Sequence, residues 1–306
     1  MIRVKGDEMK NMKLVGTLAI IGATLCYGLV PSLSFMAFDT GLVSETILFN
    51  KFLYAAIIMW AYIFIKKIPF KLTRDQIKPM IVVVLAYAGI AITLYLAFEN
   101  ISGSLATIIE FTFPAMVIAV EMIRGREPVR AVKIIAVIMS MIGLALVVWS
   151  PDMEIKMIGV IWAFLCAVCY VFYTIGLAHH TLKGVNSFVT AGYVMVTSAV
   201  INFFRCMFSD APMFSQGGDQ LFFVLMLAIV NAFLAIMLFC LGVKLIGPTN
   251  ASIINTAEPV CACVFGYFLI GDVITKTMVI GGFLVVLAVL LTNLPDKTEK
   301  LPDDPQ

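Results

Sequence analysis

The composition of this 306-residue chain excludes a soluble globular protein. Hydrophobic residues make up 61% of the sequence, charged residues make up 13%, and the mean hydropathy is +1.03. A soluble domain has roughly a quarter of its residues charged, so these values predict an all-α integral membrane protein. The formal net charge is +2, and the basic residues form no patch interleaved with aromatic residues, which predicts no binding of nucleic acid.

Ten apolar segments are long enough to cross a bilayer whose hydrocarbon core is about 30 Å thick. Since an α-helix rises about 1.5 Å per residue, each crossing needs roughly 20 residues. We place the ten transmembrane helices at residues 14–34, 43–65, 79–98, 102–123, 132–150, 157–178, 187–207, 220–241, 250–270 and 276–293. The first follows a basic head but has no small-residue cleavage site, so we interpret it as an uncleaved membrane anchor.

The Lys and Arg residues lie mostly on one side of these segments. With the N-terminus in the cytoplasm, 17 of the 21 fall in inner segments and 3 in outer segments, while Lys51 lies inside the second span. Basic residues near the ends of spans are retained in the cytoplasm. The pattern therefore predicts that both termini and the Arg124–Arg130 loop are cytoplasmic.

A stretch around the fourth span recurs near the ninth. Shifting Ile101–Pro128 by 145 residues places Pro114 on Pro259 and Glu127 on Asp272. The starts of the two halves also match, at an offset of 143, through Gly16, Cys26 and Tyr27 and their counterparts Gly159, Cys169 and Tyr170. Ordered matches of this kind indicate an internal duplication.

An odd number of spans in each half turns the second half upside down relative to the first. The duplication therefore predicts two inverted five-helix repeats, residues 1–150 and 151–294. The remaining segment, 295–306, is polar and acidic, which is typical of a disordered tail.

Several of these patterns resemble the EamA-type permeases of the drug/metabolite transporter superfamily. They are the Glu258-Pro259 pair in the ninth span, the Gly271-Asp272 pair that places Asp272 thirteen residues after Pro259, and the helix starts SGSLATII and GPTNASII. The resemblance covers nearly the whole chain. It implies ten spans in two inverted halves around a central cavity, and the outward movement of small metabolites, often amino acids or related solutes. Relatives often have Arg where this chain has Lys51, and Trp where it has Tyr27.

Lys51 and Glu110 are the first candidates for the solute site. By the rise of an α-helix, both lie at about the same depth, a few ångström outside the middle of their spans. A charge near the bilayer centre costs about 2.5–3.5 kcal/mol on insertion scales, so it faces a cavity or a partner. We expect Lys51 to receive a solute carboxylate and Glu110 to receive an amine or a proton. The alternative is a structural ion pair between them, or a Lys51 side chain that reaches the outer surface.

Asn255 and Glu258 are the candidates in the second half. Asn255 is the repeat counterpart of Glu110, and a helix places Glu258 on the same face, three residues later. Pro259 has no N–H group, which predicts a local break that exposes backbone acceptors. The two side chains could line the solute site opposite Glu110, or Glu258 could only hold neighbouring helices together.

Three further residues complete the predicted binding set: Asn231, near the middle of the eighth span, and the aromatic residues Tyr27 and Tyr95. Each could line a cavity, but an interhelical hydrogen bond is the favoured role of Asn231, and aromatic helix packing is the favoured role of the two tyrosines. No phosphate-binding loop, nucleophile elbow or metal-binding helix is found in the sequence, so we expect no enzyme activity, no cofactor and no metal.

These observations predict a secondary transporter that alternates access to a site at the middle of the membrane. It would export an amino acid-like or related polar solute across the cytoplasmic membrane, with coupling to protons or ions left open. Two alternatives remain. One is a proton-coupled exporter of cationic compounds that uses Glu110 as proton carrier. The other is a membrane-embedded enzyme that handles lipids.

Overall fold

The computed structural model describes residues 2–98, 100–101, 106, 109–125, 131–148, 156–209, 211–271 and 275–292. Within these ranges all regular secondary structure is helical. The predicted tail at 295–306, residues Glu127 and Asp272, and most of the Arg124–Arg130 loop lie outside the described residues, as does the side chain of Tyr95.

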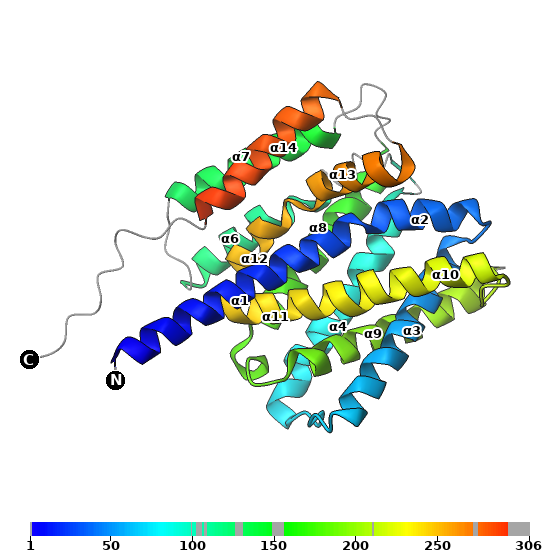
Figure 1. Ribbon diagram of the computed structural model, residues 1–306, viewed down its shortest axis with the longest axis horizontal. Coiled ribbons are helices and arrows are strands. Elements are labelled where there is room, and N and C mark those ends of the chain that lie inside the picture. The colour runs from blue at the N-terminus through cyan, green and yellow to red at the C-terminus, as the bar shows by residue number, and fades with distance from the viewer. Residues whose placement is uncertain are drawn as a thin grey trace, which may run out of the picture.

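The first half of the chain forms six labelled helices (Figure 1). They are α1 (Ile2–Gly28), α2 (Val30–Asp39), α3 (Ser44–Ile65), α4 (Arg74–Phe98), α6 (Phe113–Ile123) and α7 (Ala131–Val148). Leu29 separates α1 from α2, and Pro31 occupies the first turn of α2, where a missing N–H group costs no helical hydrogen bond.

The second half forms a similar series. It consists of α8 (Met157–Leu177), the short 3-10 helix η1 (His180–Leu182), α9 (Ser187–Phe208), α10 (Gly218–Leu227), the π-helix η2 (Ala228–Ala235), α11 (Ile236–Ile246), α12 (Pro248–Asn255), α13 (Glu258–Ile270) and α14 (Lys276–Thr292). Asn186 caps α9 by accepting a hydrogen bond from the Phe188 amide at 2.9 Å, and α13 ends at the left-handed Gly271.

Every one of the ten predicted segments contains helix. Seven helical stretches are long and apolar enough to cross a membrane: Asn11–Asp39, Ser44–Ile65, Arg74–Leu94, Met157–Leu177, Ser187–Phe208, Gly218–Ile246 and Pro248–Ile270. Three shorter apolar helices, Phe113–Ile123, Ile134–Leu146 and Val279–Ala288, fall in the other predicted segments. The protein is thus an all-helical membrane bundle, and ten complete crossings stay a prediction.

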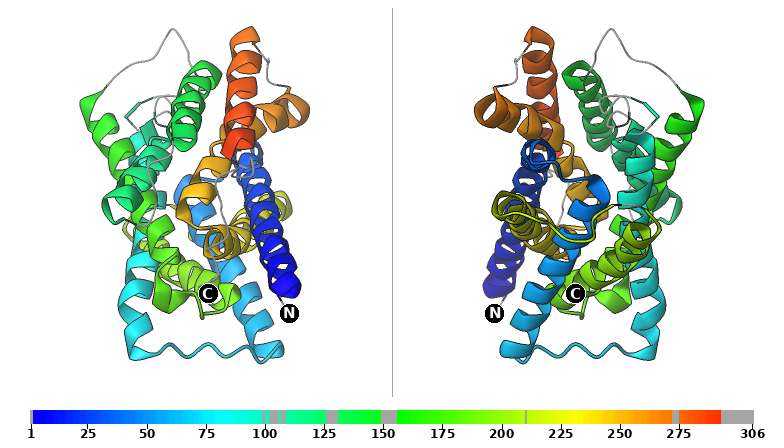
Figure 2. Two further views of the ribbon diagram at one scale, coloured as in Figure 1. Left: turned by 90° about the vertical axis from the view of Figure 1, so that its left-hand side faces the viewer. Right: turned by 90° about the vertical axis from the view of Figure 1, so that its right-hand side faces the viewer.

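The closest helix contacts join the two halves of the chain. Helix α1 packs against α11, α3 against α9, α4 against α8, α6 against α12, and α7 against α14. Helices α7 and α14 lie side by side at one end of the molecule, opposite the loop that joins α3 to α4 (Figures 1 and 2). At the level of the predicted spans, exchanging each span for its counterpart in the other half leaves this set of pairs unchanged. The two halves are therefore interleaved, and both contribute buried side chains to a large core cluster.

The α7–α14 contact depends on a glycine. A Cβ atom built at Gly143 would lie 2.6 Å from the backbone oxygen of Gly281 and 2.9 Å from Cγ2 of Val285. Small residues at helix crossings in membranes allow backbones to approach closely, which supplies packing energy where lipid provides no hydrophobic driving force.

We therefore expect Gly143→Ala to push α14 away from α7 and to lower the free energy of unfolding by about 1–3 kcal/mol, the usual cost of overpacking. Thermal melting of the purified protein in detergent measures the change. Gly184→Ala is the matched control, because a Cβ atom there meets nothing within 4 Å. A Gly143→Ala protein that melts at or above the wild-type temperature would contradict the close approach.

Candidate functional site

Two broken helices lie at equivalent places in the two halves. In the first half, Glu110 is the last helical residue before a turn at Phe111 and Thr112, after which α6 begins. In the second half, α12 ends at Asn255, a turn follows at 256–257, and α13 begins at Glu258. The two breaks coincide under the 145-residue shift.

A proline near the start of the following helix explains each break. Pro114 and Pro259 occupy the first turn of α6 and α13. Because proline has no N–H group, it cannot bond to the carbonyl four residues earlier, and the preceding helix ends there. The structure confirms the break predicted at Pro259 and adds the equivalent break before Pro114.

The second break is held together by an amide side chain. Asn255 donates from Nδ2 to Oε2 of Glu258 at 3.1 Å, which confirms that the two residues share a face. Its Oδ1 atom accepts a hydrogen bond from the Thr24 hydroxyl of α1 at 3.2 Å. Asn255 is fully buried and Glu258 is partly exposed. The arrangement leaves part of the Glu258 carboxylate for another partner.

Glu110 faces the second half of the chain. Its carboxylate accepts a contact from the Cys166 thiol of α8 at 3.7 Å, and only 7% of the residue is exposed. Helix α12, which ends at the second break, contacts both α6, which follows the first break, and α8, which carries Cys166. The two breaks thus bring two acidic groups into one region of the bundle.

Lys51 binds an amide rather than a carboxylate. Its ammonium donates to Oδ1 of Asn231 at 3.0 Å and lies 5.0 Å from the centre of the Phe52 ring. The structural ion pair between Lys51 and Glu110, one of the two alternatives to a solute site, is therefore not formed. The reason is packing: α3 carries Lys51 against η2 and α9, whereas Glu110 lies against α8.

Asn231 lies in the middle of the π-helix η2. Short π-helical segments are rare and occur often at functional sites. The sequence AIVNAFLA gives no periodicity that distinguishes this segment from an ordinary apolar helix, so the π-helix was not predicted. The one available signal was the polar Asn231 itself, which stands alone among apolar neighbours.

A buried aromatic cluster extends from Phe52, beside Lys51, to Phe113 and Tyr170, which lie about one helical turn from Glu110 and from its contact Cys166. We call this the central aromatic cluster, and its members are Tyr27, Phe52, Tyr87, Phe113, Tyr170, Tyr173 and Phe239. The rings of Phe113 and Tyr170 stack at 4.5 Å, those of Tyr87 and Tyr173 lie 5.0 Å apart, and Phe52 lies 6.1 Å from Tyr87. The sequence suggested Tyr27 as a lining residue but did not indicate Phe52, Phe113, Tyr173 or Phe239.

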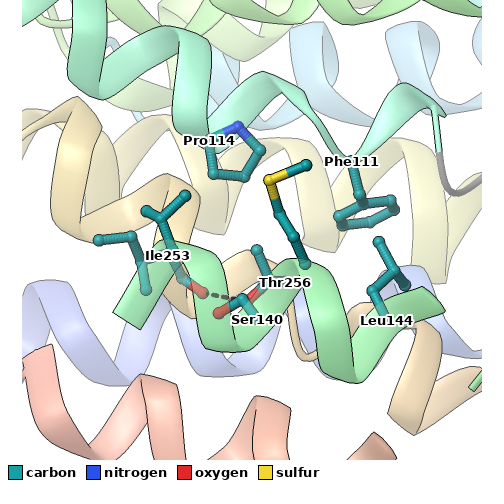
Figure 3. Close-up of a pocket in the computed structure, with 8 residues that line it drawn as sticks. Phe111, Pro114, Ser140, Leu144, Ile253 and Thr256 are labelled. Atoms are coloured by element: carbon teal, nitrogen blue, oxygen red, sulfur yellow. Dashed lines mark hydrogen bonds between the residues drawn. The ribbon is translucent and has the colours of Figure 1, made fainter. Parts of the chain in front are cut away.

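A narrow cleft separates the broken helices from α7 (Figure 3). Eight side chains line it: Phe111, Pro114, Val137, Ser140, Met141, Leu144, Ile253 and Thr256. The hydroxyl of Thr256 donates to Ser140 across the cleft at 3.3 Å. Because its lining carries no charged side chain, we do not assign the solute to it. In the part of the chain that the structure describes, no three His, Cys, Asp or Glu side chains gather as metal ligands.

A helical membrane bundle of two interleaved halves, with broken helices that carry buried polar groups, has an architecture that membrane transporters use. The comparison with known families specifies this class further. The chain belongs to the EamA-like transporter family, whose sequence model matches residues 14–149 and again residues 157–294. It is a multi-pass membrane transporter.

Two curated relatives and one solved structure are similar to this chain. The "Uncharacterized inner membrane transporter YicL" of Salmonella typhimurium is 22% identical over 73% of this chain and 75% of the relative. An "Uncharacterized transporter" of Archaeoglobus fulgidus is 25% identical over 64% of this chain and 68% of the relative. One solved crystal structure superposes on this chain with a TM-score of 0.80 at 15% sequence identity. The match covers 91% of this chain and 96% of the other chain, and at this identity it shows only that the two chains share a fold.

The Lys51–Asn231 hydrogen bond makes a testable prediction about stability. Asn231→Leu leaves a buried ammonium without its acceptor, so it should destabilise the protein more than the double variant Lys51→Met with Asn231→Leu. We expect a coupling of about 0.5–3 kcal/mol from the double-mutant cycle, measured by melting in detergent. The control cycle combines Asn50→Leu with Lys51→Met. Asn50 donates to the backbone oxygens of residues 46 and 213, whereas Lys51 donates to Asn231, so the effects of these two substitutions should add. Additive effects in both cycles would contradict the pair.

Proposed function

We propose that this protein is a secondary transporter that exports an amino acid-like or related polar solute by alternating access. The solute site lies around the central aromatic cluster, with Lys51 and Asn231 at one end and Glu110, Asn255 and Glu258 at the other. The arrangement that carries the proposal is one buried cationic group and two carboxylates on helices that contribute to the same aromatic cluster.

The charges favour a zwitterion. A solute carboxylate can replace the amide oxygen that Lys51 now binds, because an ammonium bonds more strongly to a charged acceptor. A solute ammonium can pair with Glu110 or Glu258, and Tyr27 and Tyr170 supply aromatic faces that attract cations. Tyr95 completes this proposed set as a candidate on α4.

The helix pairing supports the mechanism. Each of the five helix pairs described above joins the two halves, and the set of spans that they pair is symmetric under exchange of the halves. We therefore propose two inverted repeats, residues 1–150 and 151–294, related by a pseudo-two-fold axis in the membrane plane. Movement of one half against the other would open the site first to one side and then to the other.

One observation favours a second candidate function. The two helix breaks place Glu110 and Glu258 next to α6 and α12, which pack together, and this suits a pair of carboxylates that exchanges a proton for a cation, as in a proton-coupled exporter of cationic compounds. Membership of a transporter family argues against the lipid-handling enzyme. The cytoplasmic membrane is the proposed location, in agreement with the name of the Salmonella relative.

The proposed topology places both termini and the loop after α3 in the cytoplasm. In a variant without reactive native thiols, we expect Gln216→Cys to react in intact cells with a maleimide that cannot cross the membrane. Lys71→Cys should react only after permeabilisation, because its loop lies on the opposite side. Mass shift on a gel measures the labelling. Labelling of Lys71→Cys in intact cells would overturn the orientation.

The proposed site predicts which compounds bind. We expect free amino acids to raise the melting temperature, by RT ln(1 + [L]/Kd) in free energy, more than the matching amines without a carboxylate or acids without an amine. The best compound then serves as the flux substrate in proteoliposomes with an imposed pH gradient. Glu110→Gln should reduce its flux at least tenfold, because glutamine keeps the volume but loses the charge. Tenfold corresponds to about 1.4 kcal/mol.

Glu121→Gln is the matched control for this experiment. Glu121 is also buried, but it pairs with Arg124 at 3.6 Å near the end of α6, away from the proposed site. We expect the control to keep its flux, and melting curves verify that each variant is folded. Full flux of Glu110→Gln with a lowered melting temperature would assign Glu110 to structure. A larger melting shift with amines than with amino acids would favour the exporter of cationic compounds.

A further inference from the structure

A groove lies at the end of α3, beside the segment that leads to α4. Its volume is about 420 Å³. The segment crosses between the two helices at the edge of the molecule that lies opposite α7 and α14 (Figure 2). Apolar side chains form most of the lining: Ile63, Phe64, Ile68, Pro69 and Phe70. The Phe64 side chain is 58% exposed, which leaves an apolar surface open beside the groove.

Two lysines complete the lining. Lys67 and Lys71 are exposed, and neither forms an ion pair in the part of the chain that the structure describes. The surrounding segment, residues 66–78, carries five basic residues and one acidic residue. The groove therefore combines an apolar floor with an unneutralised positive rim.

The groove is already formed in this structure. Tyr193 of α9 donates its hydroxyl to the Phe70 carbonyl at 3.1 Å, and the Trp60 ring packs against Phe70 at 5.5 Å. Gln76 donates from Nε2 to the Thr181 carbonyl at 3.3 Å. These contacts hold the middle of the segment and the first turn of α4, so a ligand would meet a preorganised site.

The backbone at Lys67 gives an independent indication that the lysine has a role. Helix α3 ends with the hydrogen bonds Ile68 N to Ile63 O at 3.0 Å and Lys67 N to Phe64 O at 3.1 Å, the pattern of a Schellman motif. The motif requires a left-handed residue, usually glycine, and Lys67 adopts φ = 52°. A side chain is unfavourable in this conformation. The chain thus accepts a backbone cost at the position where the ammonium reaches the groove.

We propose that this groove binds an anionic phospholipid, with the phosphate between Lys67 and Lys71 and an acyl chain along the apolar lining. Basic pockets at the cytoplasmic ends of transmembrane helices recognise anionic head groups in this way. The apolar lining argues for a lipid over a free phosphate compound, which would make no contact with Phe64 and Ile68. The site is separate from the solute site and does not depend on which solute is transported.

The test measures thermal stabilisation of the detergent-purified protein by dioleoyl phosphatidylglycerol, dioleoyl phosphatidylcholine and glycerol 3-phosphate. We expect stabilisation by the first alone. The groove variant carries both Lys67→Gln and Lys71→Gln. In this variant, the phosphatidylglycerol concentration that gives half of the maximal thermal stabilisation should rise roughly tenfold, since each lysine contributes to binding. The matched control, Lys66→Gln with Lys78→Gln, removes the same charge outside the groove and should change this concentration less than twofold.

Lys67→Gly separates a role in binding from a role in folding. Glycine suits the left-handed position, so this variant should melt at or above the wild-type temperature in detergent alone, while it loses part of the stabilisation by phosphatidylglycerol. Equal stabilisation by phosphatidylcholine, an equal effect of glycerol 3-phosphate, or equal losses in the groove variant and its control would each overturn the proposal.

Discussion

A charged or amide side chain inside a bilayer has to find its polar partner within the protein, and this requirement decides which helices of the bundle lie together. Three contacts show it: Lys51 with Asn231, Asn255 with Thr24, and Glu110 with Cys166. Each joins the first half of the chain to the second. Neither half can satisfy its buried polar groups alone, which is why the helices interleave and share a single core.

The sequence predicted features that depend on neighbouring residues. Apolar runs located the helices, and Pro259 predicted the break because a missing N–H group acts within one turn. The common face of Asn255 and Glu258 followed from helical spacing for the same reason. The partner of Lys51 could not be predicted in this way. Two residues 180 positions apart leave no trace in local periodicity, and depth alone made Glu110 as good a candidate as Asn231.

The two helix breaks match between the halves, but the side chains beside them do not. The breaks before Pro114 and Pro259 match, yet they follow an acidic residue in one half and an amide in the other. The positions that correspond to Lys51, at offsets of 143 and 145, are Val194 and Val196. A transporter built this way presents different polar groups to its two openings. Direction and coupling would then come from side chains that the duplication did not preserve.

The 180-residue separation of Lys51 from Asn231 also has a consequence for biosynthesis. A ribosome adds about 5–20 residues per second, so roughly 10–40 s pass between the synthesis of the two residues. During this time α3 is already available for insertion, and its ammonium has no amide acceptor. The newly made first half therefore enters the bilayer as an incomplete bundle. Its most vulnerable moment comes before the chain is finished, when water, lipid head groups or the insertion machinery must solvate Lys51.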